Sequence, residues 1–272
     1  MVILEKQHII HPKRVCVIGV PISAVTMESA LEFIHANQES LCGEYICASN
    51  VHTTVMAHEH QDYHIVQSSS LLSLPDGKPL SVIGRRKANA PMEKVTGTHF
   101  MQQIMSDPRF SGKRHFFYGT HKQTLETMVT QLRKDYPQLC ICGYEPSVFR
   151  ELTDAETEAL ANRINDSRPD FIWVALGAPR QELLMYRLKG RVCGIMCGVG
   201  GAFNILAGIV SDAPVWMQNA GLEWLYRLLK EPRRLFRRYL ITKTKFIYYL
   251  LSGKLKGWLN VLEKSLHDHS QF

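Results

Sequence analysis

The 272-residue sequence has little of what would place it in a specialised structural class. It shows no internal repeat, no low-complexity segment and no secretory signal in its Lys- and His-bearing start, so repeat, disordered and secreted proteins are disfavoured. Its 7 cysteines form no CxxC pair and are odd in number. We therefore expect a reducing cytosolic setting and buried structural thiols, Cys193 and Cys197 among them, in place of a disulfide framework.

Uncharged segments long enough to cross a bilayer are also scarce. The stretch 192–211 carries no charge over about 20 residues, the length of a membrane-spanning helix. Five glycines and Asn204 interrupt it. The pattern therefore predicts a buried strand, a glycine-rich turn and a short following element, and we expect no transmembrane helix.

Signals for a metal site or a nicotinamide cofactor are weak. His60 and His64 are four residues apart on a predicted helix, but the nearby acidic residues fall on other faces and cannot complete a site. The glycine-rich run at 198–203 does not match GxGxxG, and only Asp212 follows it as a candidate ribose ligand. We predict neither cofactor.

What the sequence does have is an uneven charge distribution. The formal net charge is +7. Residues 213–272 hold 11 of the 32 Lys and Arg residues and four of the 25 Asp and Glu residues, so this tail carries the whole excess and residues 1–212 are neutral. A neutral body with a cationic tail indicates an anionic partner for the tail, such as phosphates, lipid headgroups or nucleic acid.

Apolar runs alternate with helical periodicity along residues 1–212. Strands are expected at 15–18, 45–48, 115–118, 139–142, 171–176 and 192–197. Helices are expected at 26–36, 51–60, 98–105, 122–135, 154–165 and 179–188. This alternation predicts an α/β fold, a Rossmann-like and mainly parallel sheet flanked by helices, which forms a catalytic domain over 1–212. Ligands of such sheets bind at the carboxyl ends of the strands.

The tail, 213–272, is expected to form a separate helical appendage. Helices are predicted at 221–230, at 233–251 after Pro232, and again after Gly253, with apolar residues on one stripe of the second helix and at helical spacing in the third. Beside so many basic residues, these stripes favour a basic amphipathic appendage that lies on an anionic membrane or packs over the active face of the body. The alternative is a plain pair of core helices with a solvated basic face.

Three segments could carry chemistry, one after the apolar run 71–74 and two after predicted strands. Leu74-Pro75-Asp76-Gly77 holds an acid on a turn, where it could act as a general base, although this is also a common turn sequence. Gly177-Ala178-Pro179-Arg180-Gln181-Glu182 runs from a strand end into a helix. Gly198-Val199-Gly200-Gly201-Ala202-Phe203 would let backbone amides approach a diphosphate.

Together these segments form an ordered set. Asn50-Val51-His52, the Asp76 turn, Lys94-Val95-Thr96-Gly97, the two glycine segments and the tail runs Gly221-Leu222-Glu223-Trp224-Leu225-Tyr226-Arg227-Leu228 and Glu231-Pro232-Arg233-Arg234-Leu235 follow one another. Their order and spacing resemble the WecG/TagA/CpsF family of bacterial glycosyltransferases over residues 14–252. The resemblance implies an inverting transfer of a sugar from a UDP-sugar to a saccharide on a polyprenyl diphosphate, at the inner face of the bacterial plasma membrane.

The resemblance also implies roles for individual residues. Asp76 matches the general base, and Asn50 and Gln181 match polar residues that hold substrate. Substrate or nucleotide contacts are expected from Lys94, Thr96, Gly177, Arg180, Gly198, Gly200 and Gly201. Arg227, Arg234 and Arg237 match tail arginines that close over the site. The sequence has no Asp-x-Asp metal motif, and arginines can stabilise a leaving diphosphate in place of a metal, so no cofactor is expected.

Two positions depart from the family pattern. Ala48 stands where many members have Thr, so a hydroxyl role there is lost or passed to Ser49 or Thr53. Lys94 stands where an Arg often precedes Val-Thr-Gly, which keeps the charge but loses the fork of donors.

Alternatives remain open at this point. A membrane-tethered, nucleotide-binding module without catalysis would show the same glycine loops. A nucleic-acid binder is disfavoured, because the apolar stripe of the tail suits lipid and no nucleic-acid motif is present. The donor sugar, of N-acetylmannosamine or glucose type, the acceptor saccharide and the pathway stay undefined, and the apolar tail is compatible with a homo-oligomer.

Overall fold

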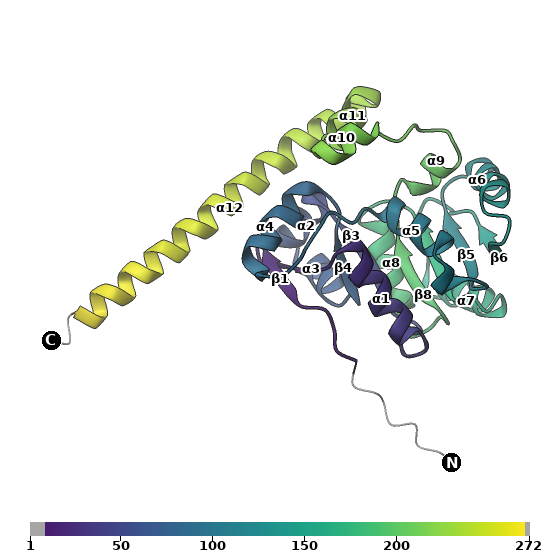
Figure 1. Ribbon diagram of the computed structural model, residues 1–272, viewed down its shortest axis with the longest axis horizontal. Helices are drawn as coiled ribbons and strands as arrows, with labels where there is room; N and C mark the ends of the chain where they lie inside the picture. Colours follow the sequence, from purple (N-terminus) through teal and green to yellow (C-terminus); the bar gives the residue numbers. More distant parts are fainter. Residues whose placement is uncertain (1–8, 270–272) are drawn as a thin grey trace, which may run out of the picture.

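A six-stranded parallel sheet forms the centre of the computed structural model, which describes the backbone of residues 9–269 and the side chains of residues 9–253 except Arg234 (Figure 1). The strand order is β4-β3-β8-β7-β5-β6. The strands are β3 (Tyr45–Ser49), β4 (Leu72–Pro75), β5 (Arg114–Gly119), β6 (Cys140–Glu145), β7 (Phe171–Ala175) and β8 (Ile195–Gly198). All five neighbouring pairs are parallel, so the α/β prediction is confirmed.

Helices cover both faces of this sheet, because side chains of a strand point alternately to its two faces. Phe171 and Trp173 of β7 pack into one apolar layer, and Ile172 and Val174 pack into the other. The first layer is covered by α1 (Met27–Asn37), α5 (Gly97–Ser106), α6 (Lys122–Asp135) and α9 (Ala202–Leu206). The second is covered by α7 (Asp154–Asp166) and α8 (Arg180–Leu188).

The predicted strand at 15–18 does not join the parallel sheet. β1 (Arg14–Val17) pairs antiparallel with β2 (Val20–Ser23) in a separate two-stranded ribbon. Ile18 and Gly19 both have positive φ, at 46° and 84°. Such a two-residue turn returns the chain directly, and without an intervening helix the second strand must run antiparallel.

Three further elements close the end of the molecule beside β4. They are α2 (Val51–Glu59), α3 (Gln61–Ser68) and α4 (Lys78–Ala88), and with the ribbon they enclose a third apolar cluster. The helix expected at 51–60 is confirmed, whereas α3, α4 and the edge strand β4 were not predicted as such. The strand expected from residue 192 begins only at Ile195, and Cys193 is exposed in the preceding turn, so the prediction of a buried thiol there is wrong.

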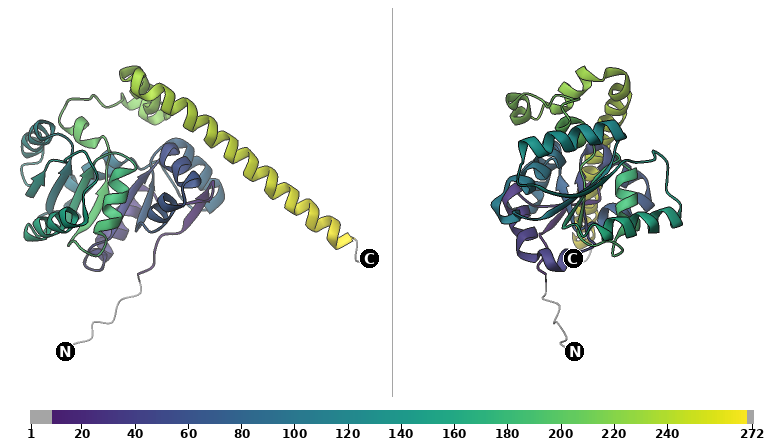
Figure 2. Two further views of the ribbon diagram at one scale, coloured as in Figure 1. Left: turned by 180° about the vertical axis from the view of Figure 1, so that it is seen from behind. Right: turned by 90° about the vertical axis from the view of Figure 1, so that its right-hand side faces the viewer.

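The C-terminal segment crosses the carboxyl-terminal edge of the sheet and then continues as one long helix. It comprises α10 (Val215–Ala220), α11 (Glu223–Lys230) and α12 (Pro232–His269), which extends well beyond the body of the molecule (Figures 1 and 2). Gly221 ends α10 in a left-handed conformation, so the expected helix at 221–230 begins two residues later than predicted. Gly253 does not end a helix as predicted. One glycine costs about 1 kcal/mol of helix propensity, and α12 continues through it.

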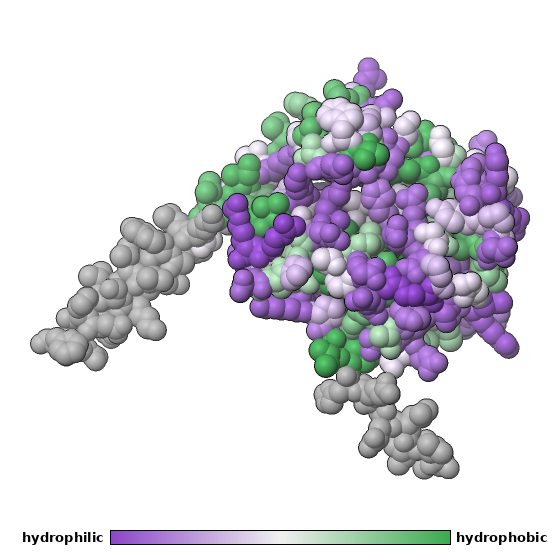
Figure 3. Space-filling model, viewed as in Figure 1, coloured by the Kyte–Doolittle hydropathy of each residue, from purple (hydrophilic) through white to green (hydrophobic). Residues whose placement is uncertain are grey.

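The expected single apolar stripe of α12 divides between two faces. Leu235, Thr242 and Phe246 are buried on the side that packs against α2. Phe236, Leu240, Ile247, Tyr248 and Leu251 stay 58–64% exposed. Hydrophobic residues are visible along the portion of α12 next to the body in Figure 3. The stripe predicted after Gly253 lies outside the residues whose side chains are described.

Candidate active site

Asp76 lies in the turn that follows β4, at the carboxyl edge of the sheet. Its backbone N–H donates to the carbonyl oxygen of Ser49 at 2.8 Å, which ties the turn to the end of β3. The residue keeps some surface exposure, yet its carboxyl group is surrounded by protein atoms, and this burial raises its pKa to about 6. Arg227 opposes the increase, Glu223 adds to it, and Lys94 opposes it. The carboxylate is therefore able to accept a proton near neutral pH.

Asn50 holds this carboxylate from the end of β3. Its Oδ1 accepts from the backbone N–H groups of His52 at 3.0 Å and Thr53 at 3.2 Å, which caps α2. The amide oxygen is thereby committed to the helix. The Nδ2 group remains to donate the hydrogen bond to Asp76, which lowers the pKa of that carboxyl.

Lys94 fastens the C-terminal segment over the same loops. Its Nζ lies 2.9 Å from Oε1 of Glu223 on α11 and 3.0 Å from the carbonyl oxygen of Gln218 on α10. Both side chains of the ion pair are only 19% exposed. Arg227 stands one helical turn after Glu223, so this pair places it on the side of Asp76. Thr96 uses its hydroxyl oxygen to cap α5, accepting from the N–H of His99 at 3.2 Å.

Gln181 joins the loops that follow β7 and β8. Its Oε1 accepts from the backbone N–H of Gly177 at 3.1 Å and of Gly200 at 3.0 Å. The side chain is 4% exposed, so it braces the two loops from beneath. A Cβ at Gly198 would lie 2.7 Å from Cε of Met185, so the end of that flexible side chain would have to move. A Cβ at Gly201 would meet open space.

The two departures from the family pattern have a structural setting. Gly97 packs so closely on the β8 loop that a Cβ there would lie 3.1 Å from Cα of Val199 and 3.3 Å from Cβ of Ala48. Ala48 thus occupies a tight contact between β3 and α5. The neighbouring hydroxyls of Ser49 and Thr53 are engaged, the first with Gln67 at 2.8 Å and the second in the α2 cap.

Arg180 and Arg237 do not contact Asp76. Arg180 donates to the carbonyl oxygen of Phe149 at 3.0 Å and lines a separate pocket of about 160 Å³. Arg237 is exposed on α12, and among the described side chains no hydrogen bond or ion pair joins it to Asp76. Arg234 lies outside the described side chains.

Two features of the site were not predicted from the sequence. Glu223 pairs with Lys94 across 129 positions of the chain, and Glu182 is a fully buried carboxyl beneath the glycine loops. Both residues belong to the ordered segments. Only the fold could show which partners they meet.

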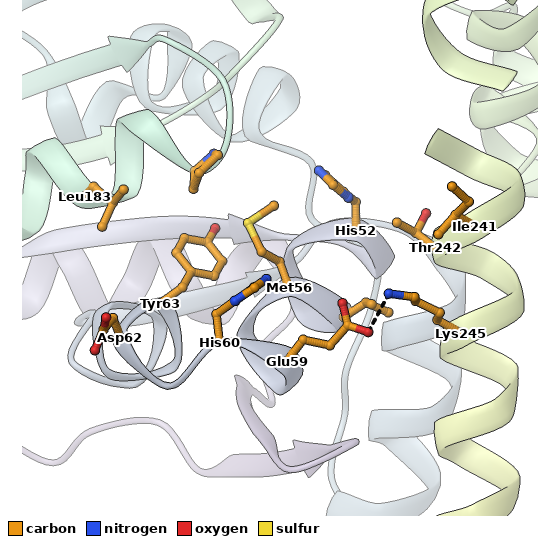
Figure 4. A pocket seen from close by; sticks show the side chains of 12 residues that line it. His52, Met56, Glu59, His60, Asp62, Tyr63, Leu183, Ile241, Thr242 and Lys245 are labelled. Carbon is orange, nitrogen blue, oxygen red and sulfur yellow. Dashed lines mark ion pairs between the residues drawn. The ribbon is translucent and has the colours of Figure 1, made fainter. Parts of the chain in front are cut away.

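A larger pocket, of about 570 Å³, opens beside the site between the body and α12 (Figure 4). Its lining is mostly apolar and comes from α2, α3, the start of α8 and the middle of α12. The lining residues are His52, Val55, Met56, Glu59, His60, Asp62, Tyr63, Pro179, Leu183, Ile241, Thr242 and Lys245. Lys245 and Glu59 form an ion pair at 2.7 Å across one end. His52 and Pro179 follow the site segments of β3 and β7, so the pocket adjoins the carboxyl edge.

Neither a membrane span nor a cluster of metal-ligand type is found in the part of the chain that is described. No helix there is apolar over a length sufficient to cross a bilayer. Nor do three or more His, Cys, Asp or Glu side chains gather there as a metal site would require.

The chain is similar to known proteins over most of its length. Residues 15–260 match the sequence model of the Glycosyl transferase WecG/TagA/CpsF family. One relative, an N-acetylglucosaminyldiphosphoundecaprenol N-acetyl-beta-D-mannosaminyltransferase of Bacillus subtilis (strain 168), is 31% identical over 74% of this chain and 77% of its own. Another of the same name, from Bacillus spizizenii (strain ATCC 23059 / NRRL B-14472 / W23), is 28% identical over 79% and 81% of the two chains.

Proposed function

Because the chain belongs to the WecG/TagA/CpsF glycosyltransferase family, we propose that it transfers a sugar from a UDP-sugar to a saccharide carried on a polyprenyl diphosphate. The two Bacillus relatives are named for transfer of N-acetylmannosamine to N-acetylglucosaminyl-diphosphoundecaprenol. The donor proposed here is of N-acetylmannosamine or glucose type. The observation that carries the proposal is Asp76, a carboxyl group with a pKa near 6 at the carboxyl edge of the sheet, beside the loop after β3 and beneath Arg227.

Asp76 is proposed as the general base. As the acceptor hydroxyl attacks the anomeric carbon, the carboxylate would take its proton, and attack opposite the leaving UDP would invert the configuration. A positioned base of suitable pKa contributes about 10² to 10⁴ in rate. Asn50, bonded to this carboxylate and fixed by the α2 cap, would keep the basic oxygen in place.

The leaving diphosphate would lie along the glycine loops. Open space beside Gly201 lets the backbone approach phosphate oxygens without a side chain in between. Arg227, already close enough to lower the pKa of Asp76, would stabilise the charge that develops on the departing group. We propose that no metal ion is required, and turnover in excess chelator tests this.

The lipid portion of the acceptor is proposed to lie in the pocket beside α12. Its walls include Val55, Met56, Leu183 and Ile241, which suit an isoprenoid chain. The pocket adjoins the carboxyl edge, and α12 presents its exposed apolar face outward. We further propose that residues 213–272 bind the inner face of the bacterial plasma membrane, so that the acceptor stays close to the lipid phase.

A donor screen tests the proposal. Purified protein is mixed with a short-chain prenyl diphosphate bearing N-acetylglucosamine or glucose, and UDP release is scored over a panel of UDP-sugars. Asp76→Asn distinguishes an enzyme from a binding module, because it should abolish transfer while UDP still binds. Flotation with anionic liposomes, set against a salt-dependent DNA shift, separates a membrane partner from a nucleic-acid partner.

A further inference from the structure

The shape of the two glycine loops depends on the orientation of one side-chain amide. Gly177 and Gly200 both present backbone N–H groups to Gln181, so the atom facing them must be an acceptor. If the amide turned over, its NH₂ group would face two donors and both N–H groups would lose their partner. A buried donor left unpaired costs more than the hydrogen bond itself contributes.

Glu182 determines this orientation. Its Oε1 accepts from Nε2 of Gln181 at 2.8 Å, which directs the amide nitrogen away from the loops and the amide oxygen toward them. Glu182 is fully buried, and burial raises its pKa to about 6. Its other oxygen, Oε2, has no hydrogen-bond partner of normal geometry. A buried carboxyl with one unpartnered oxygen is costly for stability, so its presence calls for a role other than packing.

The same hydrogen-bond network reaches the loop of the proposed base. The Tyr63 hydroxyl interacts with Glu182 and accepts from Nε2 of Gln67 at 2.9 Å. Gln67 is oriented in turn by the Ser49 hydroxyl, which donates to its Oε1 at 2.8 Å. The carbonyl oxygen of Ser49 accepts the N–H of Asp76. Buried polar groups therefore follow one another beneath the ends of β3, β4, β7 and β8, with Tyr63 between Gln67 and Glu182.

We infer that Glu182 is a positioning residue, whose carboxylate holds the Gln181 amide in the single orientation that joins the loops of Gly177 and Gly200. The loop shape follows from the structure alone. Its consequence for substrate, that these loops bind the UDP diphosphate only when they are joined, rests on the proposed function.

The test uses the full-length protein with three substitutions. Glu182→Met keeps the approximate size but removes the acceptor, whereas Glu182→Gln keeps an acceptor oxygen. Glu32→Met is the matched control, because it makes the same replacement at an exposed carboxylate of α1, away from the glycine loops. UDP affinity is measured by calorimetry, and loop structure by the amide resonances of the two glycines.

The amide resonances of Gly177 and Gly200 can be identified without assigning the whole spectrum. Gly177 is the glycine of the only Leu-Gly pair in the sequence, and Gly200 is the glycine of the only Val-Gly pair. Nitrogen-15 glycine combined with carbonyl-labelled leucine or valine therefore selects each amide in turn.

Glu182→Met should move both resonances and weaken UDP binding by at least about tenfold, since buried donors lose their fixed acceptor. Glu182→Gln and the control Glu32→Met should stay within about twofold of the unchanged protein. The inference is overturned if Glu182→Met leaves both resonances and the affinity unchanged, or if Glu182→Gln is as impaired as Glu182→Met. Should Glu182→Met fail to fold, Glu182→Ala is measured in its place, because it also removes the acceptor of the Gln181 amide and must shift the same two resonances.

The positioning role of Glu182 and the proposed function can be refuted independently. If the unchanged protein does not bind UDP, the proposed function is wrong, while the resonances of Gly177 and Gly200 still report whether Glu182 orients Gln181.

Discussion

Replacing Asp76 by Asn should stabilise the protein while it removes transfer activity. Burial raises the pKa of this carboxyl from 3.8 to about 6. Between these values the folded state holds a proton that the unfolded state has released, so the free energy of unfolding falls as the pH rises from about 4 to about 6. A shift of roughly two pKa units at 1.36 kcal/mol each amounts to about 3 kcal/mol, the destabilisation carried by the ionised carboxylate at neutral pH.

Asn cannot ionise, so Asp76→Asn should escape this penalty. At pH 7.5 the variant should be more stable by up to about 3 kcal/mol, which corresponds to a rise in Tm of about 6–12 °C for a chain of this size. At pH 4 the two proteins should have nearly equal stability. Urea unfolding followed by circular dichroism at both pH values measures the difference, and activity should fall by about 10² to 10⁴.

Asp166→Asn is the matched control. Asp166 is exposed, so its neutralisation should change stability by no more than about 0.5 kcal/mol at either pH. If Asp76→Asn shows no pH-dependent gain in the free energy of unfolding over the unchanged protein, the Asp76 carboxyl is not desolvated and its raised pKa is refuted. Unimpaired transfer by Asp76→Asn would eliminate it as the base.

Three further predictions concern the proposed reaction. The kcat/KM of the unchanged protein should fall about tenfold per pH unit below pH 6, as Asp76 takes up its proton, and steady-state rates between pH 5 and 8 test this against a flat profile. Lys94→Met and Glu223→Gln should each lower kcat/KM and expose the chain between α9 and α11 to protease. A double-mutant cycle should give a coupling free energy of at least about 1 kcal/mol. Additive effects would mean that the ion pair does not hold α11. Leu183→Asp should raise KM for a long-chain prenyl acceptor and not for a short-chain one, with Val82→Asp, exposed on α4, as control; an equal effect on both acceptors would remove the pocket from the lipid path.

The parallel sheet could be predicted because its signal is local. Each buried strand is a short apolar run, and each helix shows its own 3.6-residue period, so β3, β5, β7 and their covering helices follow from the sequence alone. The ribbon of β1 and β2 was missed because two residues with positive φ decide between a turn and a continuing strand. Gly253 misled for the opposite reason, since a weak local preference was outweighed by the helix formers around it.

The candidate site was likewise predicted only in part. The order of the segments places Asp76, Asn50 and the glycine loops at one edge of the sheet. The partners of Lys94 and Gln181 depend on how loops distant in sequence meet, and no spacing rule contains that information. The roles of Arg234 and Arg237 stay predictions, as does the division of the chain at residue 212.

The two apolar faces of α12 bear on how the protein is oriented. One face packs against α2, where Phe246 joins the apolar cluster of Val55 and Ala57, so the helix cannot rotate about its axis relative to the sheet. A membrane that binds the opposite face, with Phe236, Leu240 and Ile247, would therefore lie at a single angle to the body. The exposed apolar residues run from Phe236 to Leu251, about 22 Å at 1.5 Å per residue, a length that opposes tilt. Adsorption through α12 would thus hold the Asp76 edge at one height and in one orientation relative to the membrane. A lipid-linked acceptor would then reach the site by diffusing in the plane of the membrane.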